Sequence, residues 1–477
     1  MRKKISLFTL FLSLCLLFTG CGQAGSQEAE ERIQEEETDL SSRQKEFYAF
    51  LNEVNESRRA IYCDGKAPVL DENWTQKLAD DFSDEEIKNL LTEKTTCSVS
   101  PEEAADDVKT FFTLLKNCYG AYDYFGGDEV FLPIQEEVLS RLPAEGEVSP
   151  SDLERLLTRQ LSPILIDGHF TIGNSRLGTA HDKTMYYVDG VYFDDAGDID
   201  PALVKPTIDG EGRLRLGLAA LATPTEGVFL PTSLEIEGQS LSLQWERDTA
   251  ASWDRKDSFI ETALDDGTPL LISHAMWGNQ SQLDRLAECG ADYTDSPVLV
   301  LDVRGNGGGS DLYINEWFNS YAGQYPDQRL AFAQKLSAAN LLVYQFQLND
   351  KMDIDPCWDS GTNNGTWLEH EGVTLVLQDK GTASSGETAV GNLRTLENTL
   401  FLGSNTSGCS LVYNNFHFYL PNSHLDVRFG TGLILRDTGE NIDGRGFLPD
   451  LWVPSSDAAD AAERMIKYYG LNEDQAK

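Results

Sequence analysis

The chain is poor in basic residues relative to its acidic ones. It has 38 lysines and arginines against 78 aspartates and glutamates, which gives a formal net charge of −40. A surface of this sign repels the phosphates of nucleic acids and anionic lipid headgroups. No basic cluster with interleaved aromatic residues offsets it. The sequence therefore predicts no nucleic-acid partner.

The chain also lacks an uninterrupted apolar run of membrane-spanning length. The run ISLFTLFLSLCLLF at residues 5–18 is shorter than the ~20 residues that a spanning helix needs. It follows the basic MRKK and precedes Thr19, Gly20 and Cys21. This pattern resembles a bacterial lipoprotein signal, with Phe18 where leucine is usual; an ordinary secretory signal is the alternative. The resemblance implies a lipid on Cys21 and an anchor on the outer face of a cell membrane.

Cysteines with zinc-ligand spacing are missing as well. The spacings of the eight cysteines match no zinc-binding pattern, and the sequence predicts no metal or organic cofactor. An exported protein can form disulfides, and a bridge among Cys63, Cys97 and Cys118 is one option that the sequence leaves open. The oligomeric state also stays open.

The composition changes along the chain and predicts a multidomain protein of the α+β or α/β class. After a signal peptide at 1–20, residues 21–43 are acidic and nearly free of apolar side chains, which predicts an unfolded tether. Residues 44–160 show helical spacing with Ser-acidic capping signatures. Residues 161–290 read as a small β-rich module. Residues 291–477 alternate strands and helices, which predicts an α/β core with a partly parallel sheet.

The stretch GTASSGETAVGNL, residues 381–393, follows the strand-like VTLVLQ and places hydroxyls at the start of a helix. A helix N-terminus offers free N–H groups and partial positive charge. Ser384 could be a nucleophile there, with the Ser385 N–H as an oxyanion donor. The alternative is that Thr382, Ser384 and Ser385 only cap the helix.

A glycine run ends another buried strand. LDVRGNGGGSD, residues 301–311, carries three consecutive glycines and lacks the GKS or GKT of a phosphate loop. Bare backbone can aim N–H groups at a ligand, so Gly307 or Gly308 would complete an oxyanion hole; a plain flexible turn is the alternative.

A nucleophilic serine needs a base. Of the six histidines, His169 lies in ILIDGHFTIGN, at an Asp-Gly break between two apolar stretches. A histidine at such a break can project into a cleft, although a half-buried loop histidine would have the same sequence.

Four blocks in one order, LVLDVRGNGGG, LVLQDKGTASSGE, LGSNTSGCS and IDGRGFLPDLWV, resemble those of the C-terminal processing (tail-specific) serine peptidases. The resemblance covers residues 291–455 well and extends more loosely to about residue 100. It implies a ClpP/crotonase-like α/β catalytic core, and it places the nucleophile at Ser384, three residues before Glu387.

The processing proteases with a Ser–Lys site have a lysine where this chain has Cys409. This departure allows two interpretations. Either the protein is inactive, or it belongs to the branch that resembles the tricorn protease core and uses a histidine in place of the lysine. That branch implies His169 of the Asp-Gly-His block as base and a carboxylate near the last strand, Asp443 or alternatively Glu440.

These residues predict a membrane-anchored, extracytoplasmic serine endopeptidase that cleaves exported proteins or peptides by Ser–His acyl transfer. The alternative is a catalytically inactive lipoprotein of the same fold that binds peptides or other ligands. In the tail-specific peptidases a PDZ domain stands where the β-rich module lies, but its carboxylate-binding glycine loop is not found in this sequence.

Overall fold

The computed structural model describes residues 23–64, 66–79, 81–236, 239–253, 256–436 and 439–472. The predicted signal peptide and the lipidation site Cys21 lie outside these residues. The chain separates into two compact units, residues 1–49 and 50–477. Among the described residues, no helix combines the length and the apolar character needed to cross a membrane.

The acidic segment predicted to be an unfolded tether is helical where it is described, which corrects that prediction. Helix α2 runs over Gln23–Asp64. Glutamate, glutamine and alanine, which dominate its first half, are strong helix formers, so a sequence too polar to build a core can still form a single helix. Its role as a tether stays a prediction.

The predicted helices of the N-terminal part are present in the second unit. Ser100 caps α4 and exchanges hydrogen bonds with Glu103, and Ser149 caps α6 through the N–H of Asp152. Each cap satisfies N–H groups that have no partner inside the helix. The four helices here are α3 (Asp84–Leu90), α4 (Pro101–Cys118), α5 (Gly127–Ser140) and α6 (Pro150–Leu161).

A six-stranded sheet forms the α/β core, in the order β18-β15-β14-β11-β10-β9. All neighbours are parallel except the edge pair of β9 with β10. Parallel strands are buried on both faces, which explains their continuous apolar runs. Its strands are β9 (Phe259–Ala263), β10 (Pro269–Ser273), β11 (Val298–Asp302), β14 (Val373–Gln378), β15 (Thr399–Gly403) and β18 (Leu451–Trp452).

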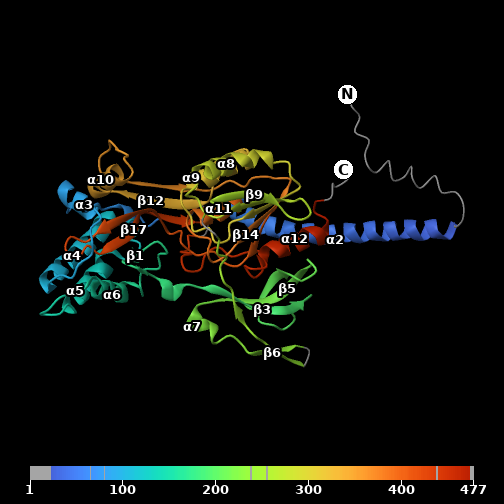
Figure 1. Cartoon of the computed structure of the whole chain (residues 1–477), viewed down its shortest axis with the longest axis horizontal. Coiled ribbons are helices and arrows are strands. Elements are labelled where there is room, and N and C mark those ends of the chain that lie inside the picture. The colour runs from blue at the N-terminus through green and yellow to red at the C-terminus, as the bar shows by residue number, and fades with distance from the viewer. Residues whose placement is uncertain are drawn as a thin grey trace. The chain divides into compact units, whose positions relative to one another are not determined.

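Helices cover this sheet (Figure 1). Apolar side chains of α8, α9 and α11 form one buried cluster with those of the strands. The helices of this part are α8 (Gln280–Glu288), α9 (Asp311–Ala322), α11 (Ser385–Leu393) and α12 (Ala458–Tyr469). The predicted strand–helix alternation is therefore confirmed.

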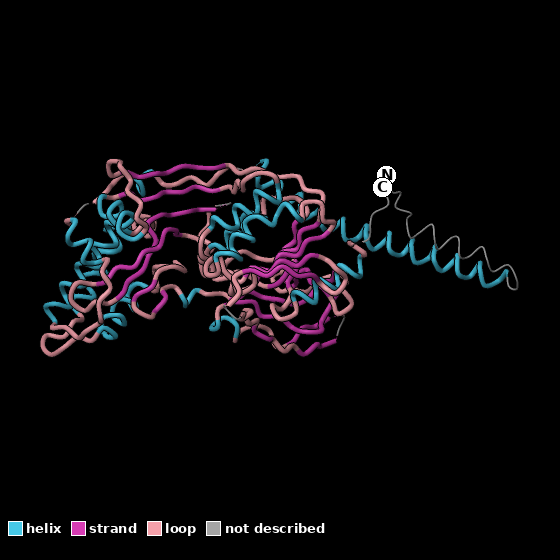
Figure 2. Tube along the Cα trace, turned by 45° about the horizontal axis from the view of Figure 1, so that its top comes forward, coloured by secondary structure: helices cyan, strands magenta, loops and turns pink. Residues whose placement is uncertain are grey.

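A second sheet joins distant parts of the sequence. Its order is β13-β12-β17-β1-β2, with β16 paired to the same β17. Figure 2 shows its long strands beside the core. Apolar residues of α4, α5, α6 and α10 pack with this sheet in one cluster. The elements are β1 (Thr171–Ile172), β2 (Ser175–Arg176), β12 (Leu330–Leu336), α10 (Ala338–Gln347), β13 (Cys357–Asn363), β16 (Val412–Tyr419) and β17 (Asp426–Arg436).

The predicted β-rich module is therefore shared among three sheets. Its start, with β1 and β2, joins β17, and its end, with β9 and β10, joins the core sheet. Between them lie a small sheet of order β4-β5-β3-β8 and a hairpin. These contain β3 (Thr184–Phe193), β4 (Val204–Ile208), β5 (Leu214–Ala222), α7 (Pro224–Gly227), β6 (Ser233–Ile236), β7 (Gln239–Ser242) and β8 (Glu246–Arg247).

Candidate active site

Ser384 lies at the N-terminal end of α11, directly after the turn that follows β14. Its backbone has φ 53° and ψ −120°, an unusual combination for a residue with a side chain that costs ~1–3 kcal/mol. Its side chain makes no capping hydrogen bond to the helix. The neighbouring hydroxyls of Thr382 and Ser385 donate to the carbonyls of Val303 and Gly309 instead. The structure therefore favours a strained, available hydroxyl over a helix cap.

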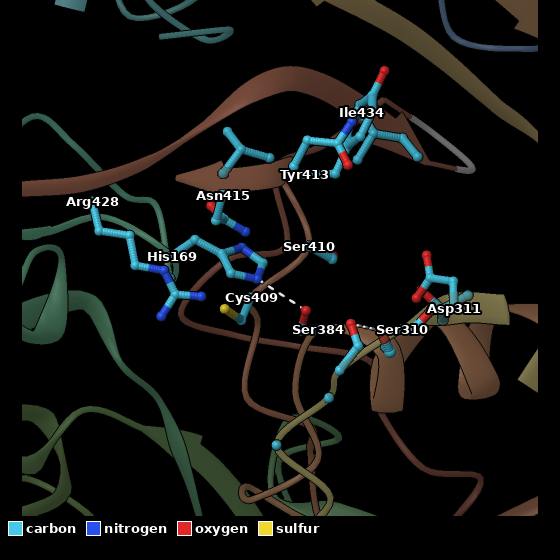
Figure 3. A pocket seen from close by; sticks show the side chains of 18 of the residues that line it. His169, Ser310, Asp311, Ser384, Cys409, Ser410, Tyr413, Asn415, Arg428 and Ile434 are labelled. Carbon is cyan, nitrogen blue, oxygen red and sulfur yellow. Dashed lines mark hydrogen bonds between the residues drawn. The ribbon is translucent and has the colours of Figure 1, made fainter. Parts of the chain in front are cut away.

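His169 meets this hydroxyl. Its Nε2 lies 3.1 Å from Ser384 Oγ, although 215 positions separate the two residues (Figure 3). The contact arises because β1, which starts two residues after His169, pairs with β17 of the C-terminal half. The expected hydrogen-bond contact between the two side chains is present; their catalytic roles stay predictions.

The imidazole is held in its neutral form. Burial lowers the pKa of His169 to about 3, and the nearby positive charges of Arg428 and Arg176 act in the same direction. A neutral ring whose Nε2 accepts from the Ser384 hydroxyl carries its hydrogen on Nδ1. This Nδ1 is buried and has no hydrogen-bond partner among the described residues.

A buried carboxylate fixes the backbone of His169. Asp167 Oδ1 accepts a hydrogen bond from the His169 N–H at 2.8 Å, and Asp167 Oδ2 accepts one from the Tyr119 hydroxyl at 2.8 Å. Burial, and next to it the charge of Asp443, raises the pKa of Asp167, whereas these hydrogen bonds lower it. Tyr119 thus connects helix α4 to the position of the candidate base.

Asp443 acts on the backbone rather than on the imidazole. Its Oδ2 accepts from the Gly168 N–H at 2.8 Å, and its Oδ1 accepts from the N–H groups of Ser410 and Leu411 at 2.8 and 3.0 Å. Burial raises its pKa, and the three N–H donors oppose this. Asp443 therefore ties the Asp-Gly-His block to the loop before β16.

Glu440, the alternative carboxylate, does not reach the site. Its side chain is 68% exposed and lies 3.6 Å from Arg445. It is not among the residues that line the cleft around Ser384. Of the two carboxylates predicted from the sequence, only Asp443 bonds to the Asp-Gly-His block, at the Gly168 N–H.

The glycine turn lies against the serine. A Cβ on Gly308 would come within 2.6 Å of the Ser384 Cβ, so only glycine permits this approach. The Gly308 N–H, however, donates to Asn306 Oδ1 at 2.9 Å, so it is not a free oxyanion donor as predicted. In the described structure, no acceptor is recorded for the N–H groups of the other two predicted donors, Gly307 and Ser385.

Asn306 is a site residue that the sequence analysis missed. It is fully buried, its Nδ2 donates to the Ser273 carbonyl at 2.9 Å, and its own carbonyl accepts from the Ala383 N–H at 2.9 Å. It therefore joins the glycine turn to the nucleophile turn. The asparagine between two glycines was the signal available in the sequence.

Glu387 and Lys380 were also missed as structural parts of the site. Glu387 is buried and accepts from the N–H groups of Gly408 and Cys409 at 2.8 and 2.7 Å. Burial raises its pKa to about 6. Lys380 Nζ donates to the carbonyls of Ser407 and Gly444 at 2.8 and 3.0 Å, and burial lowers its pKa to about 8. Both residues hold the loops that surround the nucleophile.

Cys409, at the position where the processing proteases with a Ser–Lys site have a lysine, is a buried neutral thiol. Burial, with the charges of Asp443 and Glu387, raises its pKa well above the usual value. A protonated thiol is a poor base and a poor nucleophile. A Cβ on Gly168 would lie 2.8 Å from Cys409 Cβ, so this side chain packs closely under the Asp-Gly-His block.

An open cleft of about 1120 Å³ surrounds the pair. Both Ser384 and His169 are half-buried and face it. Exposed apolar side chains, Trp277, Leu312 and Leu348, also line it. Among the described residues, no group of three or more His, Cys, Asp or Glu could hold a metal ion. Cys63 and Cys97 are not in disulfides, so a bridge among the three N-terminal cysteines is not formed.

Comparison with known protein families gives one match. Residues 277–453 match the model of peptidase family S41. This segment contains the glycine turn, Ser384 and Asp443, whereas His169 precedes it. No curated protein matches the chain.

Solved structures with a similar arrangement are distant. Mature CPAF in complex with lactacystin shares 11% identity over 78% of this chain and 98% of its own, with a TM-score of 0.43. The photosystem II D1 C-terminal processing protease shares 16% identity over 78% and 98%, with a TM-score of 0.39. A lipoprotein from Streptococcus agalactiae shares 12% identity over 76% and 96%, with a TM-score of 0.40.

Proposed function

We propose that the chain, whose residues 277–453 match the model of peptidase family S41, is a serine endopeptidase with a Ser384–His169 site. The observation that carries the proposal is the 3.1 Å contact between His169 Nε2 and Ser384 Oγ in an open cleft. Nucleophile and base within hydrogen-bond reach are the signature of an activated serine.

The reaction would proceed by acyl transfer. Ser384 Oγ attacks the peptide carbonyl carbon while its proton moves to His169 Nε2, and His169 then donates that proton to the leaving amine as the C–N bond breaks. Water, deprotonated by the same imidazole, hydrolyses the acyl-enzyme. At neutral pH the His169 ring is in the base form that proton abstraction requires, while the burial and positive charge that lower its pKa also make it a weaker proton acceptor.

The negative charge on the former carbonyl oxygen needs N–H donors. Ser385 N–H at the start of α11 supports this role, since it has no acceptor recorded in the described structure and follows the nucleophile directly. Gly307 N–H is the second donor that the proposal assigns. One such donor typically contributes about 3 kcal/mol to transition-state stabilisation.

The proposal also places the enzyme outside the cytoplasm. Its support is the sequence alone: a basic start, a short apolar run and Thr19-Gly20-Cys21. Lipid on Cys21 would anchor the protein to the outer face of the membrane, where exported proteins and peptides are available as substrates. Mass spectrometry of the protein made in a bacterial host tests this, because diacylation of Cys21 adds a defined mass.

A serine-directed fluorophosphonate probe tests the catalytic site. We expect labelling of the wild-type protein that Ser384→Ala abolishes without lowering the thermal midpoint, together with cleavage of denatured casein. His169→Ala should lower both by ~10³-fold or more, because the base is lost. Absent labelling and intact casein would instead favour the second candidate, a ligand-binding lipoprotein, which the buried thiol of Cys409 at the lysine position keeps open.

A further inference from the structure

Two arginines stand beside the candidate base. Thr171 of β1 pairs with Arg428 of β17 on one side and with Arg176 of β2 on the other. Directly paired residues on adjacent strands point to the same face of a sheet. All three line the cleft, as does His169, two residues before Thr171. Figure 3 shows the Arg428 guanidinium beside the His169 ring, on the side away from Ser384.

Arg428 has no protein partner. Arg176 is paired with Asp182, whereas no hydrogen bond or ion pair is recorded for Arg428 within the described part of the chain. Its Nε is buried without an acceptor. A partly desolvated guanidinium without an anion is costly, and this chain has 78 acidic residues from which a partner could have come. The unpaired charge therefore faces the cleft for a reason other than stability.

The cleft differs in charge from the rest of the protein. Its charged lining consists of Arg176, Arg428, Arg436 and Asp311, and is thus net positive in a chain of net charge −40. A cleft lined by one sign of charge concentrates ligands of the opposite sign. Guanidinium groups bind carboxylates through two parallel hydrogen bonds.

We propose that Arg428, with Arg176 beside it, binds a carboxylate of the substrate close to the scissile bond. This inference rests on the proposed peptidase function and assigns its substrate class: peptides with an acidic side chain within a few residues of the cleavage point. A free C-terminus presents the same chemical group, and the test below separates the two.

Such a carboxylate would act on turnover as well as on binding. During catalysis His169 takes a proton and becomes positively charged, and the nearby charge of Arg428, which has no paired carboxylate, opposes this change. A bound carboxylate neutralises Arg428 and lowers the energy of the imidazolium. Acidic substrates should therefore have a higher kcat than neutral ones, and neutral substrates should be cleaved faster once the Arg428 charge is removed.

The test starts from the cleavage sites in denatured casein, mapped by mass spectrometry. A decapeptide that spans the preferred site is made in four forms, with glutamate or glutamine near the scissile bond and with a free or amidated C-terminus. We expect a loss of at least tenfold in kcat/KM for one of these replacements, mostly in kcat. The replacement that causes the loss identifies the source of the carboxylate.

Variants assign the effect to one arginine. Arg428→Gln should cleave the acidic and neutral peptides at similar rates, with the neutral one at least as fast as in the wild type. Arg436→Gln, at the other end of the same strand, removes an equal charge and should keep the wild-type ratio. A thermal midpoint equal to that of the wild type shows that each variant is folded.

The outcomes are distinct for the two proposals. A protein that labels at Ser384 but cleaves all four peptides alike, or whose Arg428→Gln variant keeps the preference, refutes carboxylate recognition and leaves the peptidase assignment intact. A protein that neither labels nor cleaves refutes both.

Discussion

At the scale of single residues, the His169 ring has one unmet requirement. Its Nδ1 is buried without a partner, and so is Oδ1 of Asn415 on β16, which lines the same cleft. Figure 3 shows the Asn415 side chain next to the imidazole. A catalytic imidazole is normally oriented by an acceptor at the nitrogen that faces away from the serine. If the Asn415 amide turns so that its Oδ1 faces Nδ1, Asn415 supplies this acceptor.

We predict that Asn415→Ala lowers kcat about tenfold, which corresponds to ~1.4 kcal/mol of barrier, with little change in KM. Asn415→Asp keeps an acceptor of similar size and should retain most of the activity. Steady-state kinetics on a casein-derived peptide distinguishes the two. Equal losses in both variants, or a loss confined to KM, would contradict a role in orienting the ring.

The sequence predicted the contact between Ser384 and His169 but not the groups around it. Ser384 and His169 stand in recognisable blocks, so their types and spacing were informative. Asn415 lies in a strand whose facing side depends on pairing with β17, and the sequence alone does not give this register. The occupied N–H of Gly308 likewise depends on the rotamer of Asn306, which no motif encodes.

At the scale of elements, the strands and turns of the core followed from their patterns. The apolar runs at β11, β14 and β15 are fully buried, as parallel strands flanked by helices require. What the pattern could not give is the sheet that a strand joins. Short strands such as β1 show the same alternation whichever sheet they join. The sequence analysis therefore placed the Asp-Gly-His block in the β-rich module of residues 161–290, whereas β1 pairs with β17 of the C-terminal part.

The contact between the glycine turn and the serine turn yields a matched pair of variants. We predict that Gly308→Ala nearly abolishes activity, because its new Cβ would lie 2.6 Å from Ser384 Cβ and its φ of +99° disfavours any side chain. Gly307→Ala keeps its N–H, meets no atom within 4 Å and should lose far less. The fluorophosphonate labelling rate measures both. Similar losses would mean that close approach at Gly308 does not position the nucleophile.

At the scale of the whole molecule, buried acids and a strongly negative surface act together. Burial raises the pKa of Glu387 to about 6, and it also raises the pKa values of the neighbouring Asp167 and Asp443. An unfolded glutamate titrates near pH 4.3. Between these values the folded state binds more protons than the unfolded state, so stability falls as pH rises from about 4 to about 6.

The lowered pKa of His169 acts in the opposite direction, because its ring binds a proton below about pH 6.5 only in the unfolded state. The three raised carboxyls outweigh this one group, so we predict a higher thermal midpoint at pH 5 than at pH 7.5, the reverse of the usual behaviour of ion-paired carboxylates. Glu387 alone contributes about 1.3 kcal/mol to this difference, because part of its effect is already lost at pH 5. Repulsion among surface charges acts in the same direction, but salt screens it, whereas salt has little effect on a buried group. Differential scanning calorimetry at low and high salt therefore separates the two contributions. Glu387→Gln should reduce the part that persists in high salt, and an unchanged high-salt pH response in this variant would show that Glu387 does not contribute to it.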